Sequence, residues 1–275
     1  KTIVQSHIFF PHKSLQCLNN LIDFSDKGLL VISMDKGFHR LSHIDHKNEP
    51  DIITHGSFSL WVNYHAFGEF CHKKGGKTLF PAYSTFHLQI GCLLFLDESD
   101  SYTHTNAAYQ QSVNDFGPDD FNSLKKSAYR NIENLLFVDL IALLRLSAYD
   151  AAFFIKILPQ LKKVSKSISV DDRFRLEQTL HKIWEAYFNI HESYDLAYEL
   201  GCFFYDLGFY QAALNYYEYS VKIYGQKGDI YYNKILCFYQ LRQDKLFSKT
   251  LKEAKEVFPN NTDFKQLDKL NLNAV

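Results

Sequence analysis

The sequence of 275 residues predicts two structural parts, an α/β part at the amino terminus and an all-helical repeat domain after it. Strand-like apolar runs occur only before about residue 100, and almost everything after residue 117 has the spacing of amphipathic helices. When the sequence is aligned with itself so that Tyr198 falls on Tyr232, side chains of similar type recur at this spacing. We therefore expect an α/β region over 1–100, a linker over 101–116 and a helical domain over 117–275.

The amino-terminal part is predicted to alternate helices and strands. A helix over 14–24 precedes a nearly continuous apolar run over 29–34, which is typical of a central parallel strand covered on both faces. A second helix is expected over 60–74. Two strands over 77–81 and 86–95, separated by a short turn, follow it. This order is typical of the end of an open α/β sheet with an antiparallel hairpin at its edge.

The remainder of the chain is predicted to be helical. Gly117-Pro118 with two acidic residues after it is a helix-start signal, because proline and acids favour the first turn. The expected helices cover 119–131, 134–146, 149–163, 171–189, 194–207, 210–224, 229–241 and 244–257. Short loops join them, which is typical of antiparallel helix pairs.

The alignment that places Tyr198 on Tyr232 matches five pairs of side chains. The pairs are Tyr198 with Tyr232, Phe204 with Phe238, Leu207 with Leu241, Tyr217 with Leu251, and Ser220 with Ala254. The stretch from Tyr198 to Tyr217 resembles the tetratricopeptide repeat, with Gly201 and Ala213 as the small residues where paired helices cross, and Gly208 in the turn. Pro259 is expected to end the array. The resemblance implies a surface that binds a protein or peptide.

The second unit departs from this pattern, because Ile235 and Phe247 replace the two small residues. An unrelated array of helix hairpins is the alternative interpretation. The stretches Ala151–Phe154 and Trp184–Phe188 could be degenerate earlier repeats, although their spacing is poor.

The amino-terminal part carries a further set of motifs. Asp35-Lys36-Gly37 follows the first predicted strand, and His55-Gly56-Ser57-Phe58-Ser59 precedes the second predicted helix. Over about residues 14–96 this order resembles the carboxyl half of the MidA-type, S-adenosylmethionine-dependent class I methyltransferases, whose sheet ends in a reversed strand that the hairpin over 77–95 fits. The resemblance implies an incomplete Rossmann-like sheet with Asp35 and Gly37 beside the cofactor. An acid after a strand is also a common turn cap.

A substrate cleft is a second implication of that resemblance. Asn63, Tyr64 and His65 would line it, but on a helix Tyr64 and His65 could equally satisfy local hydrogen bonds. Class I methyltransferases cradle the cofactor with a glycine-rich loop and an acidic residue on two earlier strands. No such glycine cluster occurs in these residues, since the adjacent pair Gly75-Gly76 follows a helix. We therefore expect a piece of a longer protein or a degenerate relative that binds no S-adenosylmethionine alone.

Composition narrows the range of partners. With 30 Lys and Arg against 31 Asp and Glu, the net charge of −1 gives no general attraction for nucleic acid or anionic lipid. No apolar run reaches the roughly 18 residues of a membrane span, and no signal peptide is evident. Five widely spaced cysteines without a C-x-x-C pair are typical of free thiols in a reducing compartment. The sequence predicts a cytoplasmic protein that binds neither nucleic acid nor membrane.

One loop contains residue types that bind metals, namely His39, His43, Asp45, His46 and His55. Their spacing does not match the fixed intervals of helical metal ligands, so we expect solvated loop residues and no metal site. Two functions therefore stay open: a protein-binding module, or a full-length protein methyltransferase whose repeats select the substrate.

Overall fold

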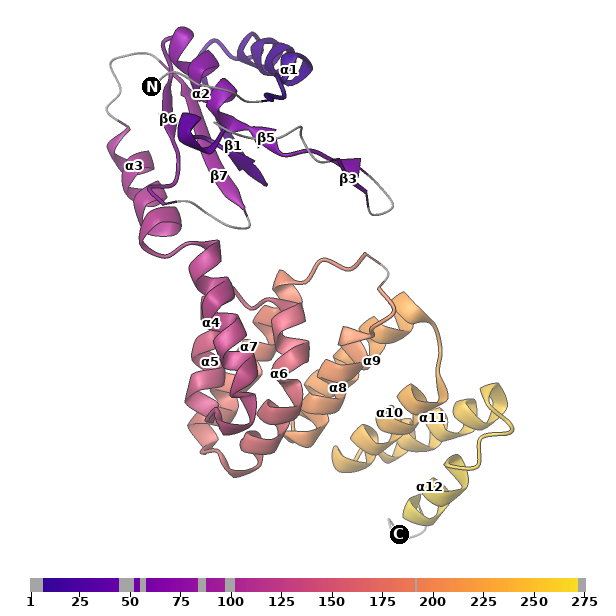
Figure 1. Ribbon diagram of the computed structural model, residues 1–275. Helices are drawn as coiled ribbons and strands as arrows, with labels where there is room; N and C mark the ends of the chain where they lie inside the picture. The colour runs from indigo at the N-terminus through magenta and orange to yellow at the C-terminus, as the bar shows by residue number, and fades with distance from the viewer. Residues whose placement is uncertain are drawn as a thin grey trace. The chain divides into compact units, whose positions relative to one another are not determined.

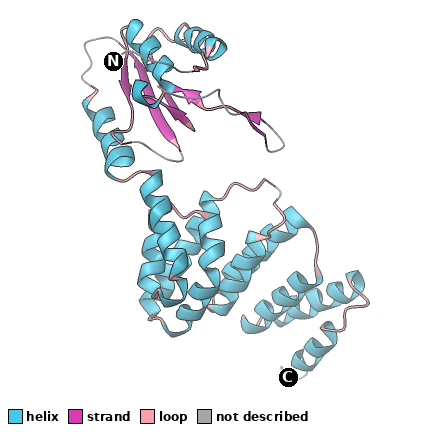
Figure 2. Cartoon of the chain, in the orientation of Figure 1, coloured by secondary structure: helices cyan, strands magenta, loops and turns pink. Residues whose placement is uncertain are grey.

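The computed structural model describes residues 7–44, 52–54, 58–83, 88–96, 102–190 and 192–271. The chain divides into two compact units, Lys1–Lys126 and Ser127–Val275 (Figures 1 and 2). The first is a mixed α/β region with small sheets, and the second is largely helical and made of packed helix pairs. This confirms the order of the two parts predicted from the sequence. Within the described ranges, no helix combines the length and apolar composition needed to cross a membrane.

Within the described residues, the main sheet of the α/β unit has three strands. They are β1 (Leu29–Asp35), β6 (Lys77–Leu79) and β7 (Gln89–Phe95), in the order β1-β7-β6. β7 lies in the middle and runs antiparallel to both neighbours, so β1 and β6 run in the same direction. The prediction of a central parallel strand at residues 29–34 is therefore wrong. In the described part of the chain, β1 is an edge strand whose one partner is antiparallel.

The exposure of β1 alternates along the strand, as expected for a strand covered on one face. Leu30, Ile32 and Met34 are 45%, 66% and 55% exposed. Val31 lies on the other face, against a core formed by Leu18, Cys71, Leu93 and Phe95. A continuous apolar run thus marks two apolar faces of β1, but only one of them is covered within the described residues.

Helices cover the sheet unequally. α1 (His12–Ile22) and α2 (Tyr64–Lys73) supply the side chains of the covered face. On the opposite face, α3 (Thr103–Tyr109) and the π-helical turn η2 (Gln110–Asp115) pack on β6 and β7, where the Tyr109 hydroxyl donates to the Ile90 carbonyl at 2.7 Å. Segment 101–116, predicted as a linker, therefore contains helical structure that contributes to the core of the first unit.

Several short elements lie between β1 and α2. β2 (Gly37–Phe38) pairs in parallel with β5 (Val62–Asn63), and β3 (Ile53–Thr54) pairs with β4 (Phe58–Ser59) in an antiparallel ladder. A 3₁₀ turn, η1 (Leu41–His43), follows β2.

The helical part contains every helix predicted from the sequence and one more. The helices are α4 (Pro118–Arg130), which spans the unit boundary, α5 (Phe137–Leu146), α6 (Ala151–Val164), α7 (Val170–Ala186), α8 (Leu196–Asp206), α9 (Tyr210–Tyr224), α10 (Gly228–Gln240), α11 (Asp244–Val257) and α12 (Phe264–Asn271). Short 3₁₀ turns, η3 (Ile132–Asn134) and η4 (Ser165–Ser167), precede α5 and α7. One continuous apolar core runs from α5 to α10, and a second joins α10, α11 and α12.

The two hairpins α8–α9 and α10–α11 turn in the same way. Gly208 has φ of 85°, and Arg242, which stands at the equivalent position of the next hairpin, has φ of 56°. The amide after each donates across the turn, from Phe209 to the Phe204 carbonyl and from Gln243 to the Phe238 carbonyl, both at 2.9 Å. These are equivalent helix-end motifs, in which a left-handed residue lets the chain reverse. The backbone therefore repeats at the interval found in the sequence.

Side chains at the helix crossings differ between the hairpins. A Cβ atom on Gly201 would lie 2.6 Å from the Tyr217 ring, so this ring occupies the space that the glycine leaves. Ala213 is fully buried in the same hairpin. The second hairpin instead buries Ile235 and Phe247, which are 0% and 2% exposed.

The last part of the array continues beyond its predicted end. Pro259 is exposed and follows α11, but the chain then forms α12. Phe264 of α12 is fully buried beside Ala254 and Leu251 of α11. The predicted stop at Pro259 is therefore the end of one helix, and α12 covers the last hairpin.

Candidate functional site

The two residues predicted to bind a cofactor lie close to each other along the chain, Asp35 as the last residue of β1 and Gly37 as the first residue of β2. Asp35 is exposed, and its Oδ1 accepts a hydrogen bond from the Lys36 amide at 2.7 Å, which is a local turn contact. Gly37 is packed tightly, because a Cβ there would lie 2.3 Å from the Val62 carbonyl oxygen and 2.7 Å from the Tyr64 ring. Binding of S-adenosylmethionine by Asp35 and Gly37 stays a prediction.

The predicted cleft residues form the start of α2. Asn63 caps this helix, since its Oδ1 accepts from the Ala66 amide at 3.0 Å, and its Nδ2 donates to the Phe9 carbonyl at 3.1 Å. Tyr64 is 1% exposed, with its hydroxyl 2.9 Å from the Ser33 Oγ. Desolvation raises the pKa of this phenol. The polar atoms of Asn63 and Tyr64 thus stabilise the fold, and His65 follows them half-buried.

A polar pair that the sequence did not single out lies nearby. The His39 Nδ1 is 3.0 Å from the Gln89 Oε1, and the Arg40 Nε donates to the His39 Nε2 at 3.2 Å. Because Nε2 accepts, Nδ1 carries the proton and donates to Gln89. Burial lowers the pKa of His39, which stacks on Phe80 with ring centres 5.2 Å apart. The pair is therefore neutral near pH 7.

No group of three His, Cys, Asp or Glu side chains that could hold a metal ion occurs among the residues that the structure describes. His39 and His43 are described, with ring centres 6.0 Å apart. Asp45, His46 and His55 lie outside the described ranges.

The α/β unit also contains a small hollow of about 250 Å³ between α1, α2 and the sheet. Leu18, Val31, Phe67 and Leu93 contribute to its largely apolar wall. The hollow fits a small apolar group but offers little to orient one.

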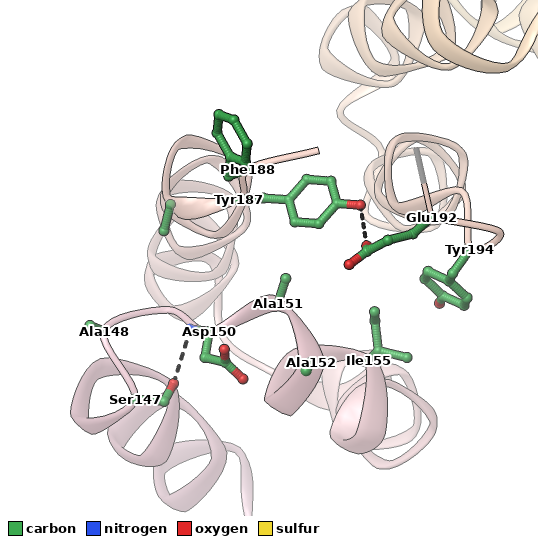
Figure 3. A pocket seen from close by; sticks show the side chains of 11 residues that line it. Ser147, Ala148, Asp150, Ala151, Ala152, Ile155, Tyr187, Phe188, Glu192 and Tyr194 are labelled. Atoms are coloured by element: carbon green, nitrogen blue, oxygen red, sulfur yellow. Dashed lines mark hydrogen bonds between the residues drawn. The ribbon is translucent and has the colours of Figure 1, made fainter. Parts of the chain in front are cut away.

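A larger cavity lies in the helical unit and has a volume of about 510 Å³ (Figure 3). Its walls come from the turn before α6, the first turns of α6, the end of α7 and the segment that leads to α8. The lining residues are Ser147, Ala148, Asp150, Ala151, Ala152, Ile155, Ala186, Tyr187, Phe188, Glu192 and Tyr194. We call this cavity the α6–α7 pocket.

The turn between α5 and α6 shapes one wall. Ala148 and Tyr149 have φ of 50° and 63°, and the Tyr149 amide donates to the Leu144 carbonyl at 2.8 Å. Asp150 then starts α6, because its Oδ1 accepts from the Phe153 amide at 2.7 Å. Small side chains at the following two positions leave the first turn of α6 open to the cavity.

The opposite wall is the segment after α7. The Tyr187 hydroxyl donates to the Glu192 Oε2 at 2.5 Å, and this hydrogen bond links the end of α7 to the residues that precede α8 (Figure 3). Tyr224 of α9 holds the far end, since its hydroxyl donates to the Tyr194 carbonyl at 2.9 Å. The Asn189 Nδ2 donates to the same hydroxyl at 3.3 Å. The described residues on either side of position 191 are thus held by contacts with one another and with Tyr224 of α9.

The described lining of the pocket combines negative charge with apolar surface. Its charged residues are Asp150 and Glu192, both exposed, and none of the described lining residues is Lys, Arg or His. Desolvation and the Glu192 contact raise the pKa of Tyr187, so its phenol keeps the proton that it donates to Glu192. Phe188 is 83% exposed and points away from the cavity floor, and Ile190 is 66% exposed. Exposed apolar groups beside a cavity are typical of interaction sites.

Both walls of the pocket contain stretches that stand out in the sequence, although nothing there joins them. Ala151–Phe154 and Trp184–Phe188, the possible degenerate repeats, each supply part of the lining. The signal is a cluster of small residues opposite an aromatic pair.

Comparison of the chain with protein-family models, curated proteins and solved structures finds no match.

Proposed function

We propose that the helical unit is a binding module that captures a protein or peptide partner at the α6–α7 pocket. The observation that carries this proposal is the exposed ring of Phe188 at the rim of a cavity of about 510 Å³. An aromatic ring that is 83% exposed gains little in the free protein, and its burial against a partner is favourable. Helix pairs of the α8–α11 kind supply a firm support for such a surface.

Crosslinking from the pocket tests this proposal. A photoreactive amino acid at Ile190, in the full chain inside cells, is expected to trap one principal partner. Phe188→Ala should then weaken that complex by at least about tenfold, because truncating a central aromatic contact typically costs about 2 kcal/mol or more. Phe24→Ala is the matched control, since Phe24 is 86% exposed in the α/β unit. Equal loss with both variants would contradict a pocket-specific site.

The methyltransferase interpretation is a second candidate, and the strand order favours it. β7 is reversed between β1 and β6, which run in the same direction, and a reversed strand late in the sheet is the feature that the resemblance implies. In the described part of the chain β1 is an edge strand, so its backbone could pair with a further strand, and its exposed side chains Leu30, Ile32 and Met34 leave room for a further covering layer. On this interpretation a longer protein transfers a methyl group, and the helical unit selects its protein substrate.

Calorimetric titration of the chain with S-adenosylmethionine tests the second candidate. We expect a dissociation constant of about 1 mM or weaker, because Asp35 and Gly37 supply at most one wall of a site that normally encloses its ligand. A micromolar constant would show a complete cofactor site here and would place the enzyme ahead of the binding module.

A further inference from the structure

The charge inside the α6–α7 pocket restricts what the partner inserts. Asp150 and Glu192 face the cavity from opposite walls, and none of the described lining residues is basic. One oxygen of each is already engaged, by the Phe153 amide and the Tyr187 hydroxyl. Carboxylate side chains ordinarily carry a negative charge at neutral pH, so the pocket contains two negative charges. A cation entering the pocket would be attracted, and an anion would be repelled.

Helix ends add to this field in opposite senses. α6 begins at the pocket with its positive pole, which the charge of its cap Asp150 offsets. α7 ends there at Ala186, and the carboxyl end of a helix is its negative pole. The sum leaves the pocket negative.

The apolar lining fits the stem of a long cationic side chain. Ala151, Ala152 and Ile155 form an aliphatic strip along α6, and Tyr187 and Tyr194 supply aromatic rings on the other side (Figure 3). Lysine and arginine combine a methylene stem, which packs on apolar surface, with a charged head that carboxylates and aromatic rings attract. A neutral side chain of the same length would form no ion pair with Asp150 or Glu192.

We infer that the α6–α7 pocket binds a lysine or arginine side chain of the partner protein, with its charge between Asp150 and Glu192. This inference rests on the proposed function and specifies the chemistry of the inserted residue. The partner then carries a basic side chain beside an apolar patch, with the patch covering Phe188 and the basic residue entering the cavity.

Capped amino acids test this inference without knowledge of the partner. The full chain, labelled with ¹⁵N, is titrated with three amino acids whose backbone is capped by an Nα-acetyl group and a carboxyl-terminal methylamide. Capped lysine and capped arginine keep their charged side chains, and capped norleucine is uncharged. The two cationic probes are expected to bind with constants on the order of millimolar and to shift the amides of Ala151, Ala152 and Glu192. The norleucine probe should bind at least about threefold more weakly, since it lacks the ion pair.

Two isosteric variants locate the charge. Glu192→Gln and Asp150→Asn should each weaken the cationic probes by about threefold to tenfold while leaving norleucine unchanged. Asparagine is as good a helix cap as aspartate, so the second variant keeps α6 intact. Glu256→Gln, an exposed position on α11, is the control and should change nothing.

Equal binding of norleucine would overturn the inference and leave a pocket selective for apolar groups, which the proposed function allows. Absence of shifts at the pocket with all three probes would also overturn it. The proposed function is tested separately, by whether Phe188→Ala weakens the crosslinked complex, and that experiment uses none of these probes.

Discussion

The two units of the chain bury their apolar side chains to different degrees. In the helical unit, one apolar core runs without interruption from α5 to α10, and large side chains such as Phe153 and Phe204 are fully buried. In the α/β unit the core is split into two small clusters on the two faces of the sheet, and Phe24 and Ile32 stay 86% and 66% exposed. Each helix pair buries its apolar face against adjacent pairs, whereas the described part of the sheet leaves one face of its edge strand β1 uncovered.

This difference agrees with the function that we propose, in which the helical unit binds a partner at its cavity. In the α/β unit, the polar atoms of Asn63 and Tyr64 are engaged in capping and packing.

Separating the two units is expected to give the largest difference between them. A fragment covering 117–275 should be helical and should unfold cooperatively, because each helix pair is stabilised by adjacent pairs. A fragment covering 1–116 should bind a hydrophobic dye and lack a sharp thermal transition, because its sheet leaves β1 uncovered. Circular dichroism and dye fluorescence measure both. A disordered helical fragment would contradict the account.

Truncating one phenylalanine in each unit tests the difference in burial between the two units. Phe204→Ala removes a fully buried ring from the helical core and should cost about 3–5 kcal/mol of unfolding free energy. Phe24→Ala removes a ring that is 86% exposed and should change stability by no more than about 0.5 kcal/mol. Denaturant titrations of the full chain compare the two. Similar losses would mean that Phe24 is covered in solution.

Overpacking tests the register of the helix pairs. Ala213→Leu adds volume where α8 and α9 cross and should cost about 1–3 kcal/mol. Gln211→Leu adds a leucine earlier on the same helix at an exposed position and should have little effect. Equal shifts of the melting midpoint would show that the register is misassigned.

The turn residues give the smallest effects. Gly208→Ala places a β-carbon on a left-handed residue and should cost about 1–2 kcal/mol. Arg242→Gly relieves the equivalent conformation, but the gain should not exceed about 1 kcal/mol, because glycine also increases the entropy of the unfolded chain. Opposite signs for the two substitutions, measured by thermal denaturation, would support equivalent turns. A destabilising Arg242→Gly would indicate that the Arg242 contact with the Tyr239 ring dominates.

Local patterns predicted the helical unit well, because helix spacing, caps and the interval that relates Tyr198 to Tyr232 can all be found by inspecting short stretches of the chain. Gly208 and Arg242 show this, since both turns follow from residues within the same hairpin. The sequence did not predict the direction of β1, because an apolar run does not specify its neighbour. It missed α12, which lies beyond Pro259 and depends on packing against α11.

The candidate sites were predicted less well for the same reason. The α6–α7 pocket joins residues near 150 with residues near 190, and only the folded chain places Asp150 opposite Glu192. Gln89 lies in a strand with apolar neighbours, and its pairing with the distant His39 is a tertiary contact. Asn63 is a candidate site residue by its type, but in the structure its side chain forms hydrogen bonds with backbone groups.

Amide hydrogen exchange on the intact chain tests most directly whether the helical unit is self-sufficient and the α/β unit is not. Peptides from α8 and α9 should exchange only through global unfolding, whereas peptides from β1 and β7 should exchange at least about tenfold faster through local opening. Increasing denaturant should accelerate the first set strongly and the second set weakly. Equal protection of β1 and α8, with the same denaturant dependence, would show one cooperative unit and would contradict this account.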